Sequence, residues 1–476
     1  MDYSHTPAFR WRRMWNWLPM GIAYALLYMG RYNLNVAQSA LGDKLMTKAQ
    51  FGTIFAVGAW VYALSFLVNG PLTDKVGGRR TMLIGVMGAL IVNFAMGLVL
   101  YGNTRLGWDM PIISTFTVLF ALNMYFQSFG AVSIVTVKAP WFHVRERGTF
   151  STIFGILISA GIFFAFDWGF AIVNASRATP KEDLGFWAAV FKSVFGLGAS
   201  GDDENWAIFF IPAILLSVFW ILMFAWLRNT PAEAGFKNFK TGEAMLSASG
   251  EREPIKTVFW KILTHPVLQV VCIVEFASGF LRNGIMQWYP KFAKEVGFSK
   301  DFWISDNWGL ALFICGVAGS FATGWISDRF FRSRRAPMAV ILYIFMFVAL
   351  VFMGGTLTGN LWLAGSAVLI VSFSVIGVHG IFSGTATADF AGTKNTGATV
   401  GIVDGLVYLG TGLQSVLIGW YAPTGPAAKD PSNWMGWPML LIPFALMGCF
   451  FANRIWNANP IPATVDEPYQ KYDLRR

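Results

Sequence analysis

Two arginines stand inside long apolar stretches, and their chemistry is the most informative feature of the sequence. Arg31 lies in the stretch 16–37 and Arg282 in the stretch 265–289. A guanidinium stays protonated at physiological pH, and placing one at membrane depth costs roughly 2.5–3.5 kcal/mol on insertion scales. Each arginine therefore needs a compensating partner, which is either an acidic side chain of the protein or an anion that the protein binds.

The surroundings of the two arginines repeat along the chain. Each arginine is followed by a polar loop, a second apolar stretch and a GxxxD motif with basic residues after it. The aspartate follows its arginine by 43 residues in the first copy (Arg31 to Asp74) and by 46 in the second (Arg282 to Asp328). This spacing indicates an internal duplication that places one buried cation in each half.

We expect the glycines of this motif to form a tight turn between helices. The aspartate would cap the next helix or pair with an arginine, and the basic residues would lie at the cytoplasmic rim. The motif residues are Gly70, Asp74, Arg79 and Arg80 in the first copy and Gly324, Asp328 and Arg329 in the second.

Composition predicts a polytopic membrane protein. Of the 476 residues, 55% are hydrophobic and only 13% are charged, a balance that is not typical of soluble domains. The predicted fold class is all-α, with twelve transmembrane helices in two pseudo-symmetric six-helix bundles, because twelve stretches reach about 18 residues or more. They lie near residues 14–38, 50–69, 81–101, 111–137, 149–174, 206–227, 266–290, 303–325, 336–355, 361–386, 396–421 and 435–453.

A polar segment divides the chain. We predict an N-terminal bundle at 1–227, a cytoplasmic linker at 228–265, and a C-terminal bundle with a cytoplasmic tail at 266–476. With the N-terminus inside, most of the 36 lysines and arginines fall in cytoplasmic loops, so the positive-inside rule places both termini in the cytoplasm. The same loops account for the net charge of +10, and we expect a lipid bilayer but no nucleic acid as a partner.

The repeated motif resembles the signature loops of the major facilitator superfamily. The matching runs are GPLTDKVGGRR and GWISDRFFRSRR. In that superfamily two six-helix bundles move about a central cavity, and the substrate binds between them near the middle of the membrane. The resemblance implies a protein of the bacterial-type inner membrane that works as a monomer. It also implies that Asp74 and Asp328 control conformation and do not bind substrate.

The stretches around the arginines resemble a narrower family. Tyr24, Tyr28 and Arg31 follow at i, i+4 and i+7 on one helical face, and Arg282 lies in FLRNGIMQWYPKF. Together with the runs QSFG…WFHVRERG and GIVDGLVYLGTG, they resemble the organophosphate:phosphate antiporters, which exchange glycerol 3-phosphate or hexose phosphates for inorganic phosphate. The resemblance assigns the substrate to Arg31, Arg282, Tyr24, Tyr28, Tyr62 and Tyr408.

Physical chemistry favours the same ligand. Two guanidiniums that face one cavity repel each other, and an oxyanion with several acceptor oxygens can bridge them through charge-assisted, bidentate hydrogen bonds. Phosphate suits this geometry better than a single carboxylate does. The sequence has no nucleotide-binding loop, no metal-ligand cluster and no nucleophile beside a base, so we expect no cofactor, no metal and no enzymatic activity.

The sequence departs from the antiporter pattern at four positions. Tyr32 and Gln287 stand where those antiporters commonly have lysine and aspartate. Phe66 replaces a lysine, and Leu157 replaces the histidine of some carriers. These changes make the predicted cavity less charged and leave the identity of the organophosphate open.

Three titratable residues inside predicted spans support other interpretations. Glu275, His379 and Asp404 could pair with an arginine and lock helices together, or they could bind substrate or carry a proton. The run RYNLNVA also resembles hexuronate and galactonate carriers, so a proton-coupled symporter of sugar acids is one alternative, although those carriers lack an arginine at the position of Arg282. A transporter-fold receptor that senses a sugar phosphate is another.

Overall fold

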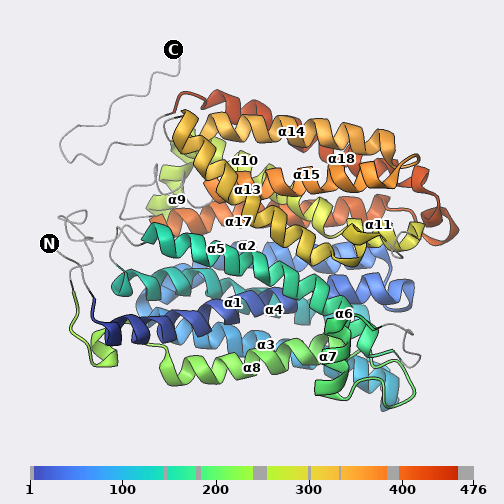
Figure 1. The fold of residues 1–476 in the computed structure, drawn as a ribbon, viewed down its shortest axis with the longest axis horizontal. Helices are drawn as coiled ribbons and strands as arrows, with labels where there is room; N and C mark the ends of the chain where they lie inside the picture. The colour runs from blue at the N-terminus through green and yellow to red at the C-terminus, as the bar shows by residue number, and fades with distance from the viewer. Residues whose placement is uncertain are drawn as a thin grey trace. The chain divides into compact units, whose positions relative to one another are not determined.

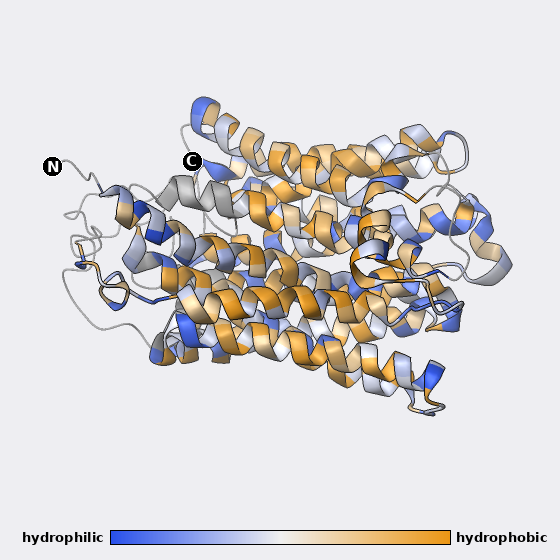
Figure 2. Cartoon of the chain, turned by 60° about the horizontal axis from the view of Figure 1, so that its bottom comes forward, coloured by the Kyte–Doolittle hydropathy of each residue, from blue (hydrophilic) through white to orange (hydrophobic). Residues whose placement is uncertain are grey.

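The computed structural model describes residues 5–142, 147–177, 184–239, 255–297, 302–331, 334–382 and 396–458. Within these ranges the chain is helical and contains no β-strand. Eleven of the described helices are long and apolar enough to cross a membrane. Hydrophobic residues follow the middle of the helices, and hydrophilic residues gather near their ends (Figure 2). The prediction of an all-α membrane protein is confirmed.

The helices form two compact units, in each of which the long helices run side by side (Figure 1). The first unit comprises Met1–Ala248 with Phe298–Phe313, and the second comprises Ser249–Gly297 with Ile314–Arg476. The long helices before residue 248 are α1 (Pro7–Leu41), α2 (Lys48–Val76), α3 (Gly78–Arg105), α4 (Ile112–Trp141), α5 (Arg147–Phe163) and α8 (Ala207–Trp226). Those after it are α10 (Pro266–Met286), α13 (Trp308–Phe331), α14 (Arg335–Thr356), α15 (Leu361–His379), α17 (Thr396–Tyr421) and α18 (Gly436–Arg454).

Helix α1 is the exception among the predicted spans. It has 35 residues, and Thr6 is its N-cap residue. The side-chain oxygen of Thr6 accepts a hydrogen bond from the amide of Phe9 at 3.3 Å. It is not one of the eleven apolar helices, because its buried residues include Arg31 and several polar amides. The span at 14–38 therefore stays a prediction, and the other eleven are confirmed by length and composition.

Two predicted spans are interrupted helices. The fifth continues from α5 through a π-helical turn, η3 (Phe164–Trp168), into α6 (Gly169–Ala175). The seventh ends at Met286 and resumes as α11 (Tyr289–Val296), because Pro290 has no backbone N–H with which to continue α10. The π-helical turn carries Asp167, whose carboxylate accepts hydrogen bonds from two amides in the first turn of α13, at 2.6 and 3.0 Å. Asp167 therefore caps α13 from another helix of the same unit.

The same helix pairings recur in both units. In the first unit α1 packs against α4, α5 and α8, and α3 packs against α4 and α8. In the second unit α10 packs against α15, α17 and α18, and α14 packs against α15 and α18. These are equivalent helices when each unit is read in chain order, so the packing supports the duplication inferred from the sequence.

Glycines bring helix backbones into contact at equivalent places. A Cβ atom on Gly161 of α5 would lie 2.8 Å from the carbonyl oxygen of Ala25 in α1. A Cβ atom on Gly410 of α17 would lie 2.1 Å from the carbonyl oxygen of Phe276 in α10. Each contacted residue precedes the arginine of its own helix by six positions. The close approach therefore lies at the same distance along the helix from both arginines.

Substituting either glycine by alanine should destabilise the protein. Gly161→Ala and Gly410→Ala would each force two backbones apart, and overpacking a core typically costs about 1–3 kcal/mol. The melting temperature in detergent measures this loss. Gly355→Ala in α14 is the matched control, since a Cβ atom there meets nothing within 4 Å. A melting temperature that falls as much in the control as in the two variants would contradict the packing argument.

Candidate functional site

Arg31 is fully buried in the first unit and is surrounded by aromatic rings and an amide. Its guanidinium carbon lies 4.6 Å from the ring centroid of Tyr28 and 4.8 Å from that of Tyr62. Nε donates to Oε1 of Gln127 at 3.1 Å, and one terminal nitrogen donates to the hydroxyl of Tyr62 at 3.5 Å. The ring faces stabilise the cation by cation–π interaction, and they do so without supplying a negative charge.

The predicted tyrosine face is present on α1. Tyr24 packs edge-to-face against Tyr28 with their centroids 5.9 Å apart, and Tyr28 in turn contacts Arg31. Tyr62, from α2, completes the group and packs edge-to-face against Phe66 at 4.9 Å. The structure therefore brings together the four first-unit residues that the sequence assigned to the substrate, in an aromatic setting that could hold the apolar body of an ester.

Tyr32 shows what replaces the lysine of the antiporter pattern. It is 2% exposed and stacks on Phe55 and Phe166, with centroids 5.9 and 5.6 Å away. These rings come from α2 and from the π-helical turn, so the position has become part of the aromatic core between helices.

Arg282 lies half-buried on α10 of the second unit, among titratable side chains. Glu275, two turns earlier on α10, is fully buried, and its Oε2 lies 2.9 Å from Nδ1 of His379 in α15. Asp404 lies on α17 of the same unit. Tyr408 follows Asp404 by one turn of α17 and is buried. Glu275, His379 and Asp404 thus belong to the same unit as Arg282, and the structure brings Glu275 and His379 into contact. From the sequence these three residues were placed only on three separate spans.

The side chain of Gln287, which stands where the antiporters have aspartate, bonds to amide and hydroxyl groups. Its Oε1 accepts hydrogen bonds from Nε2 of Gln414 at 2.9 Å and from the hydroxyl of Ser415 at 3.1 Å. The indole N–H of Trp288 donates to Oε1 of Gln414 at 3.1 Å. Amide and hydroxyl groups therefore occupy the place of the family's acid.

In the first signature motif the chain reverses at Gly77 and not at Gly70, the first glycine of the motif. Helix α2 continues through Gly70 and Asp74 to Val76, and the chain reverses at Gly77, where φ is +94°. A positive φ favours glycine because other residues have a Cβ atom that clashes there. Gly77 is also the N-cap residue of α3, and the expectation that Asp74 caps the next helix or pairs with an arginine stays a prediction. The side chain of Asp74 lies outside what the structure describes.

The basic residues of the first motif differ in their contacts. Arg79 donates from a terminal nitrogen to the carbonyl oxygen of Phe224, at 2.9 Å near the end of α8. Arg80 is exposed. Arg79 therefore fastens the start of α3 to the C-terminal carbonyls of α8, where a cation is favoured by the helix dipole.

In the second motif the aspartate pairs with an arginine, which is one of the two arrangements expected from the sequence. Oδ1 of Asp328, in the last turn of α13, lies 2.8 Å from NH1 of Arg335 at the start of α14. Gly324 lies inside α13, and Arg329 is exposed. The signal for Arg335 was the basic run after the motif, but only the structure shows which of its arginines reaches the aspartate.

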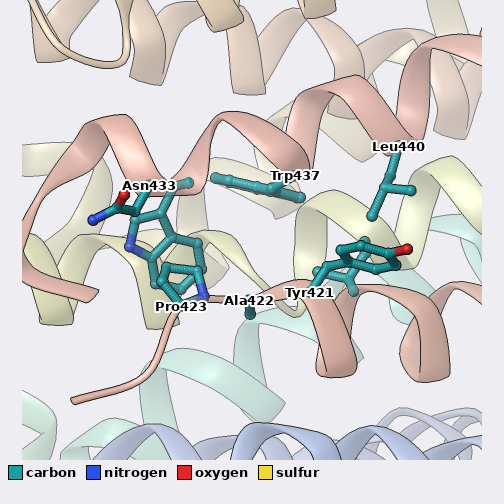
Figure 3. Close-up of a pocket in the computed structure, with 8 residues that line it drawn as sticks. Tyr421, Ala422, Pro423, Asn433, Trp437 and Leu440 are labelled. Carbon is teal, nitrogen blue, oxygen red and sulfur yellow. The ribbon is translucent and has the colours of Figure 1, made fainter. Parts of the chain in front are cut away.

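A small pocket in the second unit lies away from these residues (Figure 3). Its walls include Tyr421, Trp437 and Leu440. Tyr421 lies thirteen residues beyond Tyr408 on α17, which is about 20 Å along the helix. The ring nitrogen of Trp437 donates to the carbonyl oxygen of Gly284 at 2.7 Å, so its one N–H group is engaged within the protein. This crevice is not the predicted site.

Comparisons with known proteins show the family. Residues 20–415 match the Major Facilitator Superfamily. The chain belongs to this superfamily. Its fold resembles that of a bacterial homologue of the human lysosomal transporter Spinster, in an inward-facing and unoccupied conformation, with a TM-score of 0.71, 15% identity, and coverage of 95% of this chain and 98% of the other. Major facilitator proteins are transporters, which confirms that the chain is not an enzyme.

Among curated relatives, the chain resembles the organophosphate:phosphate antiporter family. It is 25% identical to a glycerol-3-phosphate transporter of Bacillus subtilis, over 96% of this chain and 95% of the relative. It is 23% identical to a probable hexose phosphate transport protein of Chlamydia trachomatis, over 95% and 92%. It is 24% identical to the membrane sensor protein UhpC of Escherichia coli, over 93% and 94%. The family prediction is confirmed.

Breaking the ion pair of the second motif should change transport more than binding. Asp328→Asn and Arg335→Gln both remove the pair, so we expect both to lower the transport rate by a similar factor, with a smaller change in substrate affinity. Asp74→Asn should behave in the same way if the first motif has the same role. The side chain of Asp328 is 60% exposed, and such pairs contribute at most about 1 kcal/mol to folding, so the melting temperature should change little.

Rates and affinities measured on the same vesicle preparations test this expectation. A normal transport rate combined with a large loss of affinity would place Asp328 in substrate binding instead.

Proposed function

We propose that this major facilitator protein exchanges small organic phosphate esters, such as glycerol 3-phosphate or a sugar phosphate, for inorganic phosphate by alternating access. It would do so in a bacterial-type inner membrane, as a monomer with both termini in the cytoplasm. The observation that carries the proposal is the setting of Arg31, a fully buried guanidinium held by two tyrosine rings and an amide. The glycerol-3-phosphate transporter that matches 96% of the chain supports the substrate class.

The proposal includes a clamp of two arginines. It rests on the equivalent places of Arg31 and Arg282 in the duplicated sequence and on their resemblance to the antiporters. An anion with several acceptor oxygens can take paired hydrogen bonds from each guanidinium. The engagement of Nε of Arg31 by Gln127 supports this role, because it directs the two terminal nitrogens, which form a fork that matches an oxyanion.

Exchange follows from the charge of the clamp. In an empty carrier the two cations would repel each other across a site of low dielectric constant. Coulomb's law gives about 4 kcal/mol for two unit charges that lie 4 Å apart at an effective dielectric constant of 20. A bound phosphate supplies the compensating negative charge. The loaded carrier should then change conformation readily in both directions, whereas the empty one should not.

One observation favours a second candidate, a proton-coupled symporter of sugar acids. The carboxylate of Glu275 lies 2.9 Å from the imidazole of His379 in the unit that contains Arg282. Such a pair can hold or release a proton and could neutralise Arg282 when no substrate is bound. An empty carrier neutralised in this way could return alone, and it would not require exchange.

Arg31→Lys and Arg282→Lys test the clamp directly. Lysine keeps the positive charge but loses the planar fork of donors, so each variant should lose phosphate exchange by about 100-fold or more, since charge-assisted bonds contribute about 1.5–3 kcal/mol each. Insertion and melting temperature are measured in parallel and should be retained. Substantial exchange by either variant would rule out the clamp.

Vesicles that contain only this protein distinguish the candidate functions. Uptake of labelled glycerol 3-phosphate should require phosphate inside the vesicles and should not require a pH gradient. Uptake that needs the gradient and ignores internal phosphate would instead support the symporter, and loss of accumulation in Glu275→Gln would then identify the proton carrier. Binding of the ester without uptake under any condition would indicate a sensor.

A further inference from the structure

Four buried amide side chains form a continuous hydrogen-bonded chain next to Arg31. They are Gln127 and Asn123 of α4, Asn93 of α3 and Asn33 of α1. None is more than 2% exposed. Buried amides are costly unless they are hydrogen-bonded, and a chain of four that ends on a guanidinium points to a role beyond packing.

Asn123 is the junction of this amide chain. Its Oδ1 accepts from Nε2 of Gln127 at 3.1 Å and from Nδ2 of Asn93 at 2.9 Å. Its own Nδ2 donates to the carbonyl oxygen of Gly30 in α1 at 2.8 Å. Asn93 also donates to the carbonyl oxygen of Ala89 at 2.8 Å. Asn123 therefore ties α4 to α1 and α3 at the residue directly before Arg31.

The orientations of Asn123, Asn93 and Gln127 are each fixed by a partner that can only accept or only donate. Backbone carbonyls can only accept, so those of α1 and α3 require the nitrogen atoms of Asn123 and Asn93 to face them. A guanidinium can only donate, so Arg31 requires the oxygen atom of Gln127. Turning any amide over would set two nitrogens or two oxygens against each other. The network is therefore consistent with a single arrangement, in which Gln127 must accept from Arg31.

Gly30 provides the space for this arrangement. A Cβ atom on Gly30 would lie 2.7 Å from Nδ2 of Asn93, which is closer than real Cβ contacts. Because Gly30 has no side chain, the amide of Asn93 can pack directly against the backbone of α1 next to Arg31.

We infer that Asn123 is a positioning residue for anion binding, which acts through Gln127 to hold Nε of Arg31 and to direct its terminal nitrogens at a phosphate-class oxyanion. The inference rests on the proposed function, because that function assigns Arg31 to the anion. Neutral amides suit the role. A carboxylate in the place of Gln127 would also orient the guanidinium, but it would cancel the charge that attracts the ligand.

Equilibrium binding of labelled inorganic phosphate to the purified full-length protein tests the inference. Gln127→Ala and Asn123→Ala should each raise the Kd about 10-fold or more, the effect of losing one hydrogen bond to a charged group. The double variant should bind no more weakly than Gln127→Ala alone, because the inference assigns the effect of Asn123 to its bond with Gln127 and not to its bond with the carbonyl oxygen of Gly30. Effects of the two substitutions that multiply in the double variant would overturn the inference.

Asn69→Ala is the matched control, since Asn69 is a buried amide that also bonds to α4. Asn69 of α2 is fully buried and donates to the hydroxyl of Ser128 in α4 at 2.6 Å, but it does not join the amide chain of Arg31. Its loss should lower the melting temperature while leaving the Kd within about twofold. If Asn123→Ala fails to fold, Asn123→Ser replaces it, since the shorter hydroxyl cannot span both contacts. The inference would be overturned if the Kd of either Asn123 variant stayed within about twofold of the value for the natural protein, as is expected for the control.

Arg31→Lys separates the failure of this inference from that of the proposed function. If Arg31→Lys abolishes phosphate binding while the Asn123 variants bind normally, the clamp stands and the positioning role is wrong. If Arg31→Lys binds phosphate as tightly as the natural protein, Arg31 does not hold the anion, and both fall together.

Discussion

A guanidinium withdrawn from water must direct its N–H groups at acceptors, and this constraint organises the first unit. Arg31 is fully buried, and the contacts that surround it come from three helices, namely the rings of Tyr28 and Tyr62 and the amide of Gln127. Burial of a charge is costly unless such contacts offset it. Amides of α4, α3 and α1 connect to this charge through a continuous run of hydrogen bonds that begins at Gln127.

The two equivalent arginines lie in units that contain different kinds of polar side chain. Helix α4 in the first unit and α15 in the second have equivalent packing partners. From α4 an amide reaches Arg31, whereas α15 contributes His379, whose Nδ1 lies 2.9 Å from Oε2 of Glu275 on the helix of Arg282. The unit of Arg31 therefore uses a side chain whose charge cannot change, and the unit of Arg282 contains a pair of ionisable side chains. A protein built from two copies can in this way fix one side of its chemistry and leave the other side adjustable.

Sequence reasoning found what depends on composition and on spacing along one helix. Eleven of the twelve spans follow from hydropathy, and the tyrosine face of α1 follows from the i, i+4, i+7 pattern. It did not find Asn123 as a member of the site, because an asparagine in an apolar span gives no sign of which helix it bonds to. It also did not place the turn of the first signature motif at Gly77, since the positive φ of that residue is visible only once the helices have been packed.

The backbone contacts at Gly161 and Gly410 limit how this protein can deform. Side chains between two helices can change rotamer and so absorb a displacement, but a backbone pressed on a backbone cannot be compressed. Helices α1 and α5, and likewise α10 and α17, are consequently at their limit of approach and cannot move closer together. A change of conformation within either unit would therefore have to move each pair as one body or widen the space between its two helices.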